Sequence, residues 1–182
     1  MIYLKTASDK KLVRLIRKSD NQAFKTFYFR YYEAIYRFLW YRTGSIEMAK
    51  DYTQEVFTRI WDKRQQLDPD QSIKAYLYRI AHNLFVDNLK KRAVRESAMI
   101  EMSKSHDGSF EEFTNLQMDI HNIIRRFPEP IKEVFCLSRF EGLKYNEIAE
   151  ICGVSVKTVE YRISQALEIF RKKLGDSPSK SY

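Results

Sequence analysis

Apolar residues recur every three or four positions along most of the chain, the spacing that places them on one face of an α-helix. Glycine and proline, which interrupt helices, total only 5 and 4 among 182 residues. The pattern predicts an all-α protein with helices at about residues 8–18, 20–42, 46–66, 72–95, 112–127, 129–140, 145–152 and 156–174.

Helix-breaking residues separate these segments. Gly44 and Ser45 are expected to end one helix and cap the next, and Ser72 closes the turn "LDPDQS" as the next cap. The stretch "AMIEMSKSHDGSFEE", residues 98–112, loses the helical period and collects Ser, Asp and Gly. It is typical of a flexible linker, so the chain is divided into a domain at 1–95, a linker at 96–111, a domain at 112–176 and a tail at 177–182.

The second domain contains a helix-turn-helix candidate in "EIAEICGVSVKTVEYRISQAL", residues 147–167. Gly153 is expected to end the first helix in the left-handed conformation, and Ser155 to cap the second by accepting from the Thr158 amide. The apolar seam between the two helices is predicted to contain Ile148, Ala149, Val154, Val159 and Ile163.

The opposite face of the second helix carries side chains that can meet base edges in a major groove. From Lys157 to Lys173 its charges balance to +3, which suits a phosphate backbone. A helical hairpin with a solvated charged face explains the same pattern, so both interpretations stay open here. The residues expected to point outward are Lys157, Thr158, Glu160, Tyr161, Ser164 and Gln165.

Charge is distributed unevenly. The chain has a net charge of +8, yet residues 96–119 hold six acidic residues against Lys104, a balance of −5. The remainder therefore carries +13. This excess favours a polyanionic partner, although net charge alone is a weak argument.

Several classes of function have no support in the sequence. No apolar run reaches the roughly 18 residues of a membrane span, and "MIYLKTASDK" lacks a signal peptide, so a cytoplasmic protein is expected. Cys136 and Cys152 stand singly in apolar segments, as reduced, buried thiols do. The histidines have no ligand spacing to either cysteine, so neither a metal nor a cofactor is expected. No clustered nucleophiles, paired carboxylates or phosphate-binding glycine loop indicate an enzyme.

Three blocks in this order carry a resemblance to a known family: "DYTQEVFTRIWDKRQQL", "SIKAYLYRIAHNLFVDNLKKR" and "FPEPIKEVFCLSRFEGLKYNEIAEICGVSVKTVEYRISQALEIFRKKL". Together with the acidic linker, they resemble the two-domain extracytoplasmic-function (ECF) group of sigma-70-type RNA polymerase sigma factors. The resemblance extends from about residue 19 to residue 174. It implies a factor without catalysis of its own that binds core polymerase, directs it to promoters and assists promoter melting.

The resemblance assigns a role to each block. The first is the helix that grips the clamp helices of the largest polymerase subunit, with contact residues Asp51, Gln54, Glu55, Arg59 and Trp61. The second holds the non-template strand of the minus-ten element, with Asn83 in the base pocket. Its candidate residues are Lys74, Tyr76, Tyr78, Arg79, Asn83, Lys90, Lys91 and Arg92. Packing in the core is the alternative for the two tyrosines.

The third block reads the minus-thirty-five element in the family. The resemblance adds Ser138, Arg139 and Arg162 to the outward residues of the helix-turn-helix. Lys144 stands where the family often has a Ser or Thr cap, so the helix after it is expected to depend on Asn146 or to fray. The family also implies an anti-sigma partner, commonly the cytoplasmic part of a membrane protein.

Two further interpretations remain. A conventional activator or repressor would use the same helix-turn-helix as a dimer on duplex DNA, but its N-terminal half should then contain a sensor or receiver, and no βα alternation is present. For the acidic linker, the alternatives are a solvated tether and an RNA mimic in which Asp107, Glu111 and Glu112 occupy a basic path in polymerase.

Overall fold

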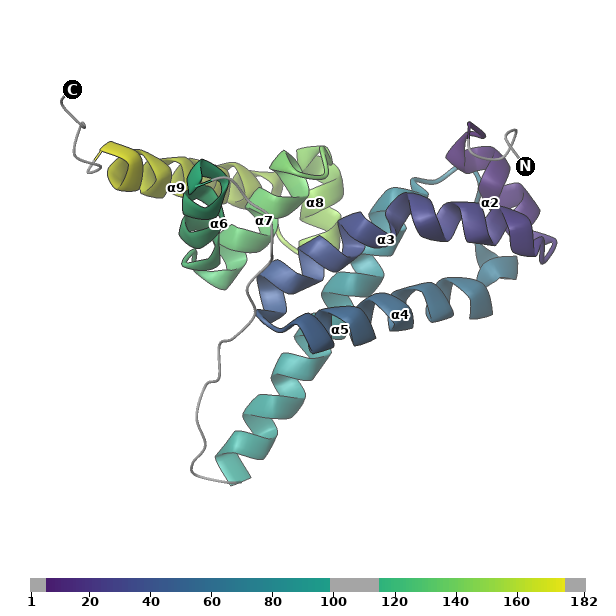
Figure 1. Ribbon diagram of the computed structural model, residues 1–182, viewed down its shortest axis with the longest axis horizontal. Helices are drawn as coiled ribbons and strands as arrows, with labels where there is room; N and C mark the ends of the chain where they lie inside the picture. Colours follow the sequence, from purple (N-terminus) through teal and green to yellow (C-terminus); the bar gives the residue numbers. More distant parts are fainter. Residues whose placement is uncertain (1–5, 99–114, 176–182) are drawn as a thin grey trace. The chain divides into compact units, whose positions relative to one another are not determined.

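The structure, a computed structural model, describes residues 6–98 and 115–175, with the side chains of residues 6–91 and 120–173. Every regular element in these ranges is a helix, which confirms the all-α prediction (Figure 1). The chain divides between His106 and Asp107 into two compact units, the N-terminal and the C-terminal unit. Apart from its first three residues, the predicted linker lies outside the described residues, and so does the predicted tail.

The N-terminal unit contains four α-helices and one short 3-10 helix among its described residues. Three of the α-helices begin at a side chain that accepts backbone N–H groups: Ser8, Asp20 and Ser45. Gly44 ends α3 in the left-handed conformation with φ 65°, and Ser72 accepts from the Ala75 amide, as predicted. The elements are α2 (Asp9–Arg17), α3 (Asn21–Thr43), α4 (Ile46–Asp62), η1 (Arg64–Gln66) and α5 (Ile73–Ala98).

The predicted helix at 46–66 is wrong in its last turn. The helix ends at Asp62, and the chain tightens into η1 after Lys63. Arg64 explains the change, because its Nη1 donates to the Trp61 carbonyl at 2.8 Å and its Nε to the Ser19 hydroxyl at 2.9 Å. These bonds hold the chain against the junction of α2 and α3 and stop the helix from continuing.

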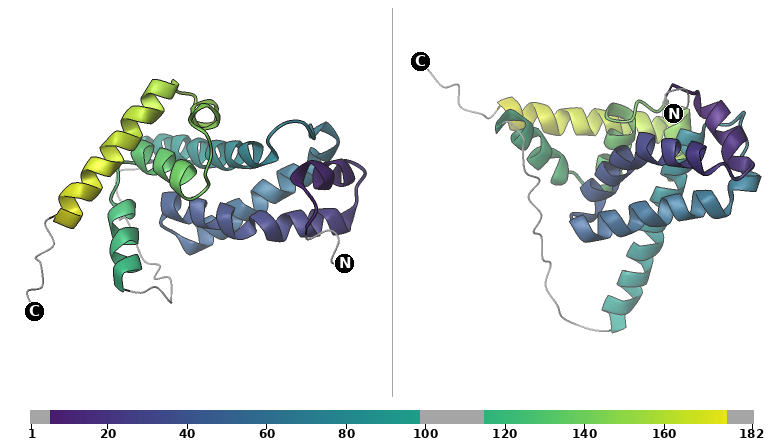
Figure 2. Two further views of the ribbon diagram at one scale, coloured as in Figure 1. Left: turned by 90° about the horizontal axis from the view of Figure 1, so that it is seen from above. Right: turned by 45° about the vertical axis from the view of Figure 1, so that its right-hand side comes forward.

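Six aromatic side chains of α3 are buried in the N-terminal core: Phe27, Tyr31, Tyr36, Phe38, Trp40 and Tyr41. Phe27 packs against Phe57 of α4 with ring centroids 6.2 Å apart, and the guanidinium of Arg42 lies 4.1 Å from the ring centroid of Phe85 on α5. Each large buried side chain stabilises the fold by about 1.5–3 kcal/mol. Beyond this core the last turns of α5 extend away from α3 and α4 (Figures 1 and 2).

A polar cluster ties the start of α2 to α3. Arg30 donates from Nη1 to the Asp9 carboxylate at 2.6 Å and from Nη2 to the Ala7 carbonyl at 2.7 Å. The Tyr31 hydroxyl donates to the second oxygen of Asp9. Burial, and then this hydrogen bond, raise the pKa of Tyr31.

The C-terminal unit is a smaller helical bundle. Its helices are α6 (Asn115–Arg125), α7 (Glu129–Arg139), α8 (Tyr145–Cys152) and α9 (Val156–Gly175). The Phe127 ring meets Phe135 and Phe170 edge-on, at centroid distances of 5.5 and 5.2 Å. This aromatic cluster joins α7 to the C-terminal half of α9, and α9 also packs against α8.

The predicted helix-turn-helix is present in the structure. Gly153 has φ 64° and donates its backbone N–H to the Ala149 carbonyl, which ends α8. The Ser155 hydroxyl accepts from the Thr158 amide at 3.1 Å, as the sequence predicts. In the predicted seam between α8 and α9, Val154 is half-buried and the other four side chains are buried.

Two sequence predictions in this unit need correction. The start of α8 depends on Glu147, whose Oε2 accepts from the Lys144 amide at 2.9 Å, and not on Asn146. A glutamate at this third helical position replaces the missing Ser or Thr cap. Cys136 is a buried thiol as expected, but the Cys152 thiol is only half-buried because it lies at the last turn of α8.

Candidate nucleic-acid and protein interfaces

The outer face of α4 presents polar side chains. Asp51, Gln54 and Glu55 are exposed, on the side of the helix opposite the buried Val56 and Ile60. Arg59 is half-buried, and its Nε donates to Glu55 at 2.7 Å. The four polar residues that the resemblance assigns to polymerase therefore lie along a single accessible face with an excess of negative charge.

Trp61 lies at the end of this helix and is half-buried. The centroids of the Trp61 and Phe24 rings are 4.8 Å apart. The Arg64 guanidinium lies 4.5 Å from the centroid of the Trp61 ring. The indole thus joins α4 to the first turn of α3 while part of it stays accessible. This placement is compatible both with packing in the core and with a surface contact.

A second polar face runs along α5. Tyr76, Arg79, Asn83 and Lys90 recur at intervals of three, four and seven residues, which places them in one stripe along the helix. Tyr76 is half-buried and the other three are exposed. The stripe offers an aromatic ring, an amide and two cations.

Other predicted residues of this block lie elsewhere. Lys74 is half-buried and faces away from the stripe, while Lys91 is exposed beside it. The side chain of Arg92 lies outside the described residues. Tyr78 is fully buried, with its ring edge-on to Phe38 at 5.2 Å. This placement fits the packing alternative and does not fit a platform for unstacked bases, so Tyr78 is left out of the surface proposed below.

The outward face of α9 is the third polar surface. Lys157, Glu160, Tyr161 and Ser164 are exposed, on the side opposite the buried Val159, Ile163 and Ala166, and the half-buried Thr158, Arg162 and Gln165 flank them. Tyr161 is 64% exposed, although it is a large ring that proteins usually cover. The face thus presents a ring, an amide, a hydroxyl and charges of both signs.

The side chains of this face differ in how far they are already engaged. The Thr158 hydroxyl lies 2.8 Å from Ser155 Oγ within the helix cap, and the Ser164 hydroxyl donates to the Glu160 carbonyl at 3.1 Å. Gln165 Nε2 is 3.5 Å from Glu168, a weak contact that a base edge could replace. At the end of α7, Ser138 is half-buried and Arg139 exposed.

Further along α9, Lys172 and Glu168 form an ion pair at 2.8 Å. The hydrogen bond to Lys172 lowers the pKa of Glu168, and the same bond raises the pKa of Lys172. Both groups are fully exposed, so salt screens the pair. Arg171 and Lys173 beside it are exposed as well, which leaves this end of α9 positive.

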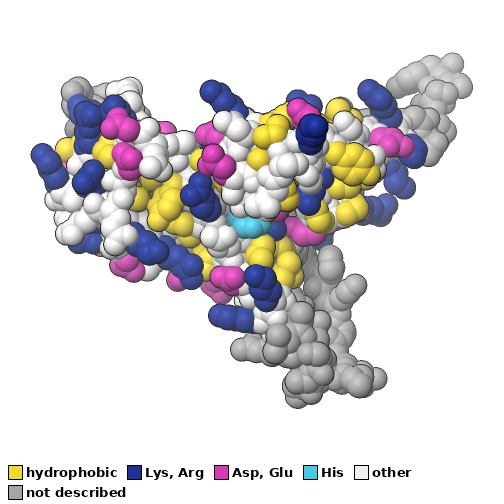
Figure 3. All heavy atoms as spheres, turned by 180° about the vertical axis from the view of Figure 1, so that it is seen from behind, with side chains coloured by type: hydrophobic (Ala, Val, Ile, Leu, Met, Phe, Trp, Pro, Cys, Tyr) yellow, Lys and Arg dark blue, Asp and Glu magenta, His cyan; other side chains and the backbone are white. Residues whose placement is uncertain are grey.

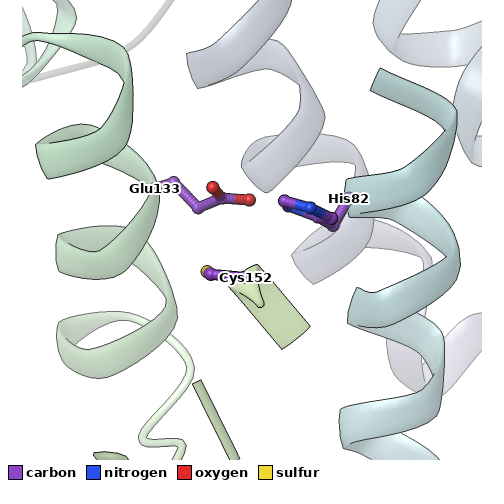
Figure 4. Close-up of side chains that lie close together, drawn as sticks. All are labelled: His82, Glu133 and Cys152. Atoms are coloured by element: carbon purple, nitrogen blue, oxygen red, sulfur yellow. The ribbon is translucent and has the colours of Figure 1, made fainter. Parts of the chain in front are cut away.

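One pair of metal-ligating side chains lies within the C-terminal unit. Glu133 on α7 and Cys152 on α8 have ligand atoms within 4.8 Å of one another (Figure 4). Two donors are fewer than the three or four protein ligands that a zinc site takes. His82, which Figure 4 also labels, belongs to α5 of the N-terminal unit. No metal site is assigned to this pair.

Within the described ranges, none of the helices combines the length and apolar character required to cross a membrane.

Family comparisons assign each unit separately. Residues 27–95 match Sigma-70 region 2, and residues 117–169 match Sigma-70, region 4. The chain is 28% identical to the ECF RNA polymerase sigma factor SigW of Bacillus subtilis, over 92% of this chain and 97% of that one. It is 26% identical to the ECF RNA polymerase sigma-E factor of Escherichia coli, over 92% and 94% of the two chains. Both relatives match over nearly their whole length.

Solved structures share the fold. The sigma factor RpoE in complex with the anti-sigma factor NepR, from Bartonella quintana, superposes with a TM-score of 0.70 at 22% identity, over 85% of this chain and 98% of that one. CnrH in complex with the cytosolic domain of CnrY gives a TM-score of 0.69 at 22% identity, over 93% and 98%.

Proposed function

The chain belongs to the sigma-70 family of RNA polymerase sigma factors, in its extracytoplasmic-function group, and on that premise we propose how its surfaces act in transcription initiation. The factor binds core RNA polymerase, directs it to promoters and assists melting. One observation carries this function: a region 2 match and a region 4 match follow one another in a single chain. A dimeric activator or repressor is not favoured, because region 2 occupies the half that would hold its sensor.

The outer face of α4 is the proposed contact with polymerase. Asp51, Gln54 and Glu55 are exposed and Arg59 is held by Glu55, so the face has a defined arrangement of donors and acceptors. Trp61 adds a half-buried ring of the kind that often contributes most to protein interfaces. A basic surface on polymerase would complement the acidic residues of α4.

The stripe on α5 is the proposed contact with the minus-ten element. Asn83 offers an amide that can pair with the edge of an extruded base, and Tyr76 offers a ring on which a base can stack. Arg79, Lys90, Lys91 and Arg92 attract the phosphates of the strand. Lys74 faces away from the stripe and is left out of this contact. Polymerase performs the chemistry, and the factor captures the separated strand.

The outward face of α9 is the proposed contact with the minus-thirty-five element. Glu160, Tyr161, Ser164 and Gln165 face the base edges in a major groove, and Lys157, Thr158 and Arg162 are near the phosphates. Ser138 and Arg139 at the end of α7 contact the same backbone. We further infer a cytoplasmic location and an anti-sigma partner. The family supports both, and so do the two similar complexes, in which RpoE is bound to the anti-sigma factor NepR and CnrH to the cytosolic domain of CnrY.

The experiment that tests this function adds the purified chain to core polymerase free of other sigma factors on promoter templates. Run-off transcripts should begin at defined sites only when the chain is present. A protein that footprints duplex DNA without polymerase, and fails to support initiation, would identify a conventional regulator instead.

A further inference from the structure

Helix α2 of the N-terminal unit carries a basic stripe that the proposed function leaves unused. Lys10, Arg14, Arg17 and Lys18 stand at positions i, i+4, i+7 and i+8, on one face of α2, and all four are exposed. The buried Leu12, Val13 and Ile16 occupy the opposite face. Figure 3 shows Lys and Arg side chains gathered at its left-hand end, where α2 lies.

Acidic side chains of the same unit leave most of this stripe uncompensated. Asp9, the single acidic residue of α2, accepts hydrogen bonds from Arg30 and Tyr31 of α3. Lys10 forms an ion pair with Asp70. Among the described residues, no acidic side chain pairs with Arg17 or Lys18. The far end of α2 thus has positive charge available for a partner.

The stripe borders the turn that leads into α5. Asp70 lies in that turn, and its pKa is lowered first by the hydrogen bond from Lys10 and also, more weakly, by Arg14. Arg64, just before the turn, donates to Ser19, the residue directly after Lys18. Ser19 has φ 62°, which is unusual for a residue other than glycine. The hydrogen bond from Arg64 holds this residue, and with it the end of α2, in a defined place.

From this arrangement we propose that Arg14, Arg17 and Lys18 form a second phosphate-binding surface, which holds the promoter DNA backbone next to the segment engaged by α5. The inference rests on the proposed function, because α5 must hold the minus-ten strand for neighbouring phosphates to reach α2. The turn itself carries Asp68 and Asp70, which repel a nucleic acid. Cations on α2 offset that repulsion at the point where the strand enters.

Charge argues for DNA and against polymerase as the occupant of this stripe. The proposed polymerase face on α4 is acidic, so its complement on polymerase is basic and would repel α2. Under the proposed function, the phosphate backbone of the minus-ten strand is the polyanion that lies beside α5 during melting.

Equilibrium binding of the holoenzyme to a fork-junction promoter probe tests the proposal. The test variant is Arg17→Gln/Lys18→Gln, and the matched control is Lys25→Gln/Lys50→Gln, which removes two exposed cations from α3 and α4. The negative slope of log K against log salt should become less steep by about 1.4–1.8 in the test variant, since each phosphate contact contributes about 0.7–0.9. The control should keep the wild-type slope, and Arg17→Lys/Lys18→Arg should restore it.

Two further measurements separate the outcomes. Neutral methylphosphonate linkages, placed one at a time along the probe, should weaken the wild-type complex at particular positions and have no added effect there in the test variant. Core-polymerase affinity, measured without DNA, should be unchanged. An unchanged salt slope overturns the proposal, and so does a loss confined to core affinity, which would assign the stripe to polymerase. Wild-type run-off transcription tests the proposed function independently of either result.

Discussion

Asn83 is the residue on which the proposed melting activity depends most directly. Its side chain is exposed on α5, in line with Tyr76 and Arg79, and an apolar replacement cannot pair with a base edge. Asn83→Leu should therefore reduce open-complex formation while the fold and core binding stay intact. Permanganate reactivity of the melted thymines measures the effect. Asn88→Leu, on the half-buried side of the same helix, is the control, and equal losses in both variants would contradict the pocket assignment.

Tyr31 predicts an alkaline limit to the stability of the N-terminal unit. Burial, and the hydrogen bond to Asp9, raise the pKa of Tyr31 above the unfolded value of 10.0. The stabilisation is fully present below about pH 10 and is lost as the pH rises above it, because only the unfolded chain then releases the proton. The Tyr31→Phe substitution should lower the free energy of unfolding by about 1 kcal/mol at neutral pH. Above pH 10 the free energy of unfolding of this variant should decline less steeply than that of the wild type. Denaturant unfolding at both pH values measures the difference.

Single residues also show where sequence patterns stop being informative. Periodicity predicts that Tyr78 lies on a helix, but a tyrosine suits either a surface or a core, and only contact with Phe38 from another helix decides between them. The half-burial of Cys152 has a similar cause, since its exposure depends on its being the last residue of α8. By contrast, Gly153 and Ser155 were predictable because their roles are local.

On helix α9, contacts with base edges and contacts with phosphates can be tested separately. Gln165 is half-buried at the edge of the outward face, and its contact with Glu168 is weak. Replacing Gln165 with Ala should change the preferred upstream sequence. Each lost bidentate contact should reduce the discrimination against the wrong base by about 1–3 kcal/mol. Arg162→Ala should weaken every upstream sequence alike. Selection from a randomised upstream element reports both effects, and recovery of the wild-type motif by the Gln165 variant would remove that contact from the interface.

The turn of the helix-turn-helix offers a test of backbone conformation alone. A Cβ at Gly153 would meet nothing within 4 Å, so the cost of Gly153→Ala comes from φ 64° and should be about 1 kcal/mol. Gly153→Asn should cost less, because asparagine tolerates the left-handed region better. Thermal unfolding of the two variants gives the comparison. Equal stability of the alanine variant and the wild type would mean that the turn adopts another conformation in solution.

Most helices were predictable because their capping residues and the spacing of their apolar residues are local features of the sequence. The exceptions involve contacts between distant parts of the chain. Arg64 meets Ser19 across 45 residues, and this bond, invisible to a local pattern, ends α4 four residues before the predicted boundary. The stripe on α2 had a local signal, the spacing of its four cations, but its position beside the turn before α5 depends on Lys10 and Asp70.

At the scale of the whole molecule, the positive surfaces on α2, α5 and α9 contrast with the balance of −5 between residues 96 and 119. Most of that segment lies outside the described residues. A polyanionic stretch cannot hold DNA. The resemblance implies instead that the segment runs toward the polymerase channel for nascent RNA, and a channel for RNA accommodates a polyanion.

The linker therefore predicts an effect of charge that a simple tether lacks. Replacing Asp107, Glu111 and Glu112 with Asn, Gln and Gln keeps the length while removing the charge of a proposed RNA mimic. Holoenzyme assembly should weaken at low salt, because the basic path in polymerase loses its occupant, and the ratio of abortive to full-length transcripts should change as the transcript no longer displaces a competitor. A variant with the segment shortened but its acids retained is the control for length. If a neutral Gly/Ser linker of equal length gives unchanged affinity and an unchanged abortive pattern, the acids are not a mimic, and the segment acts only through its length.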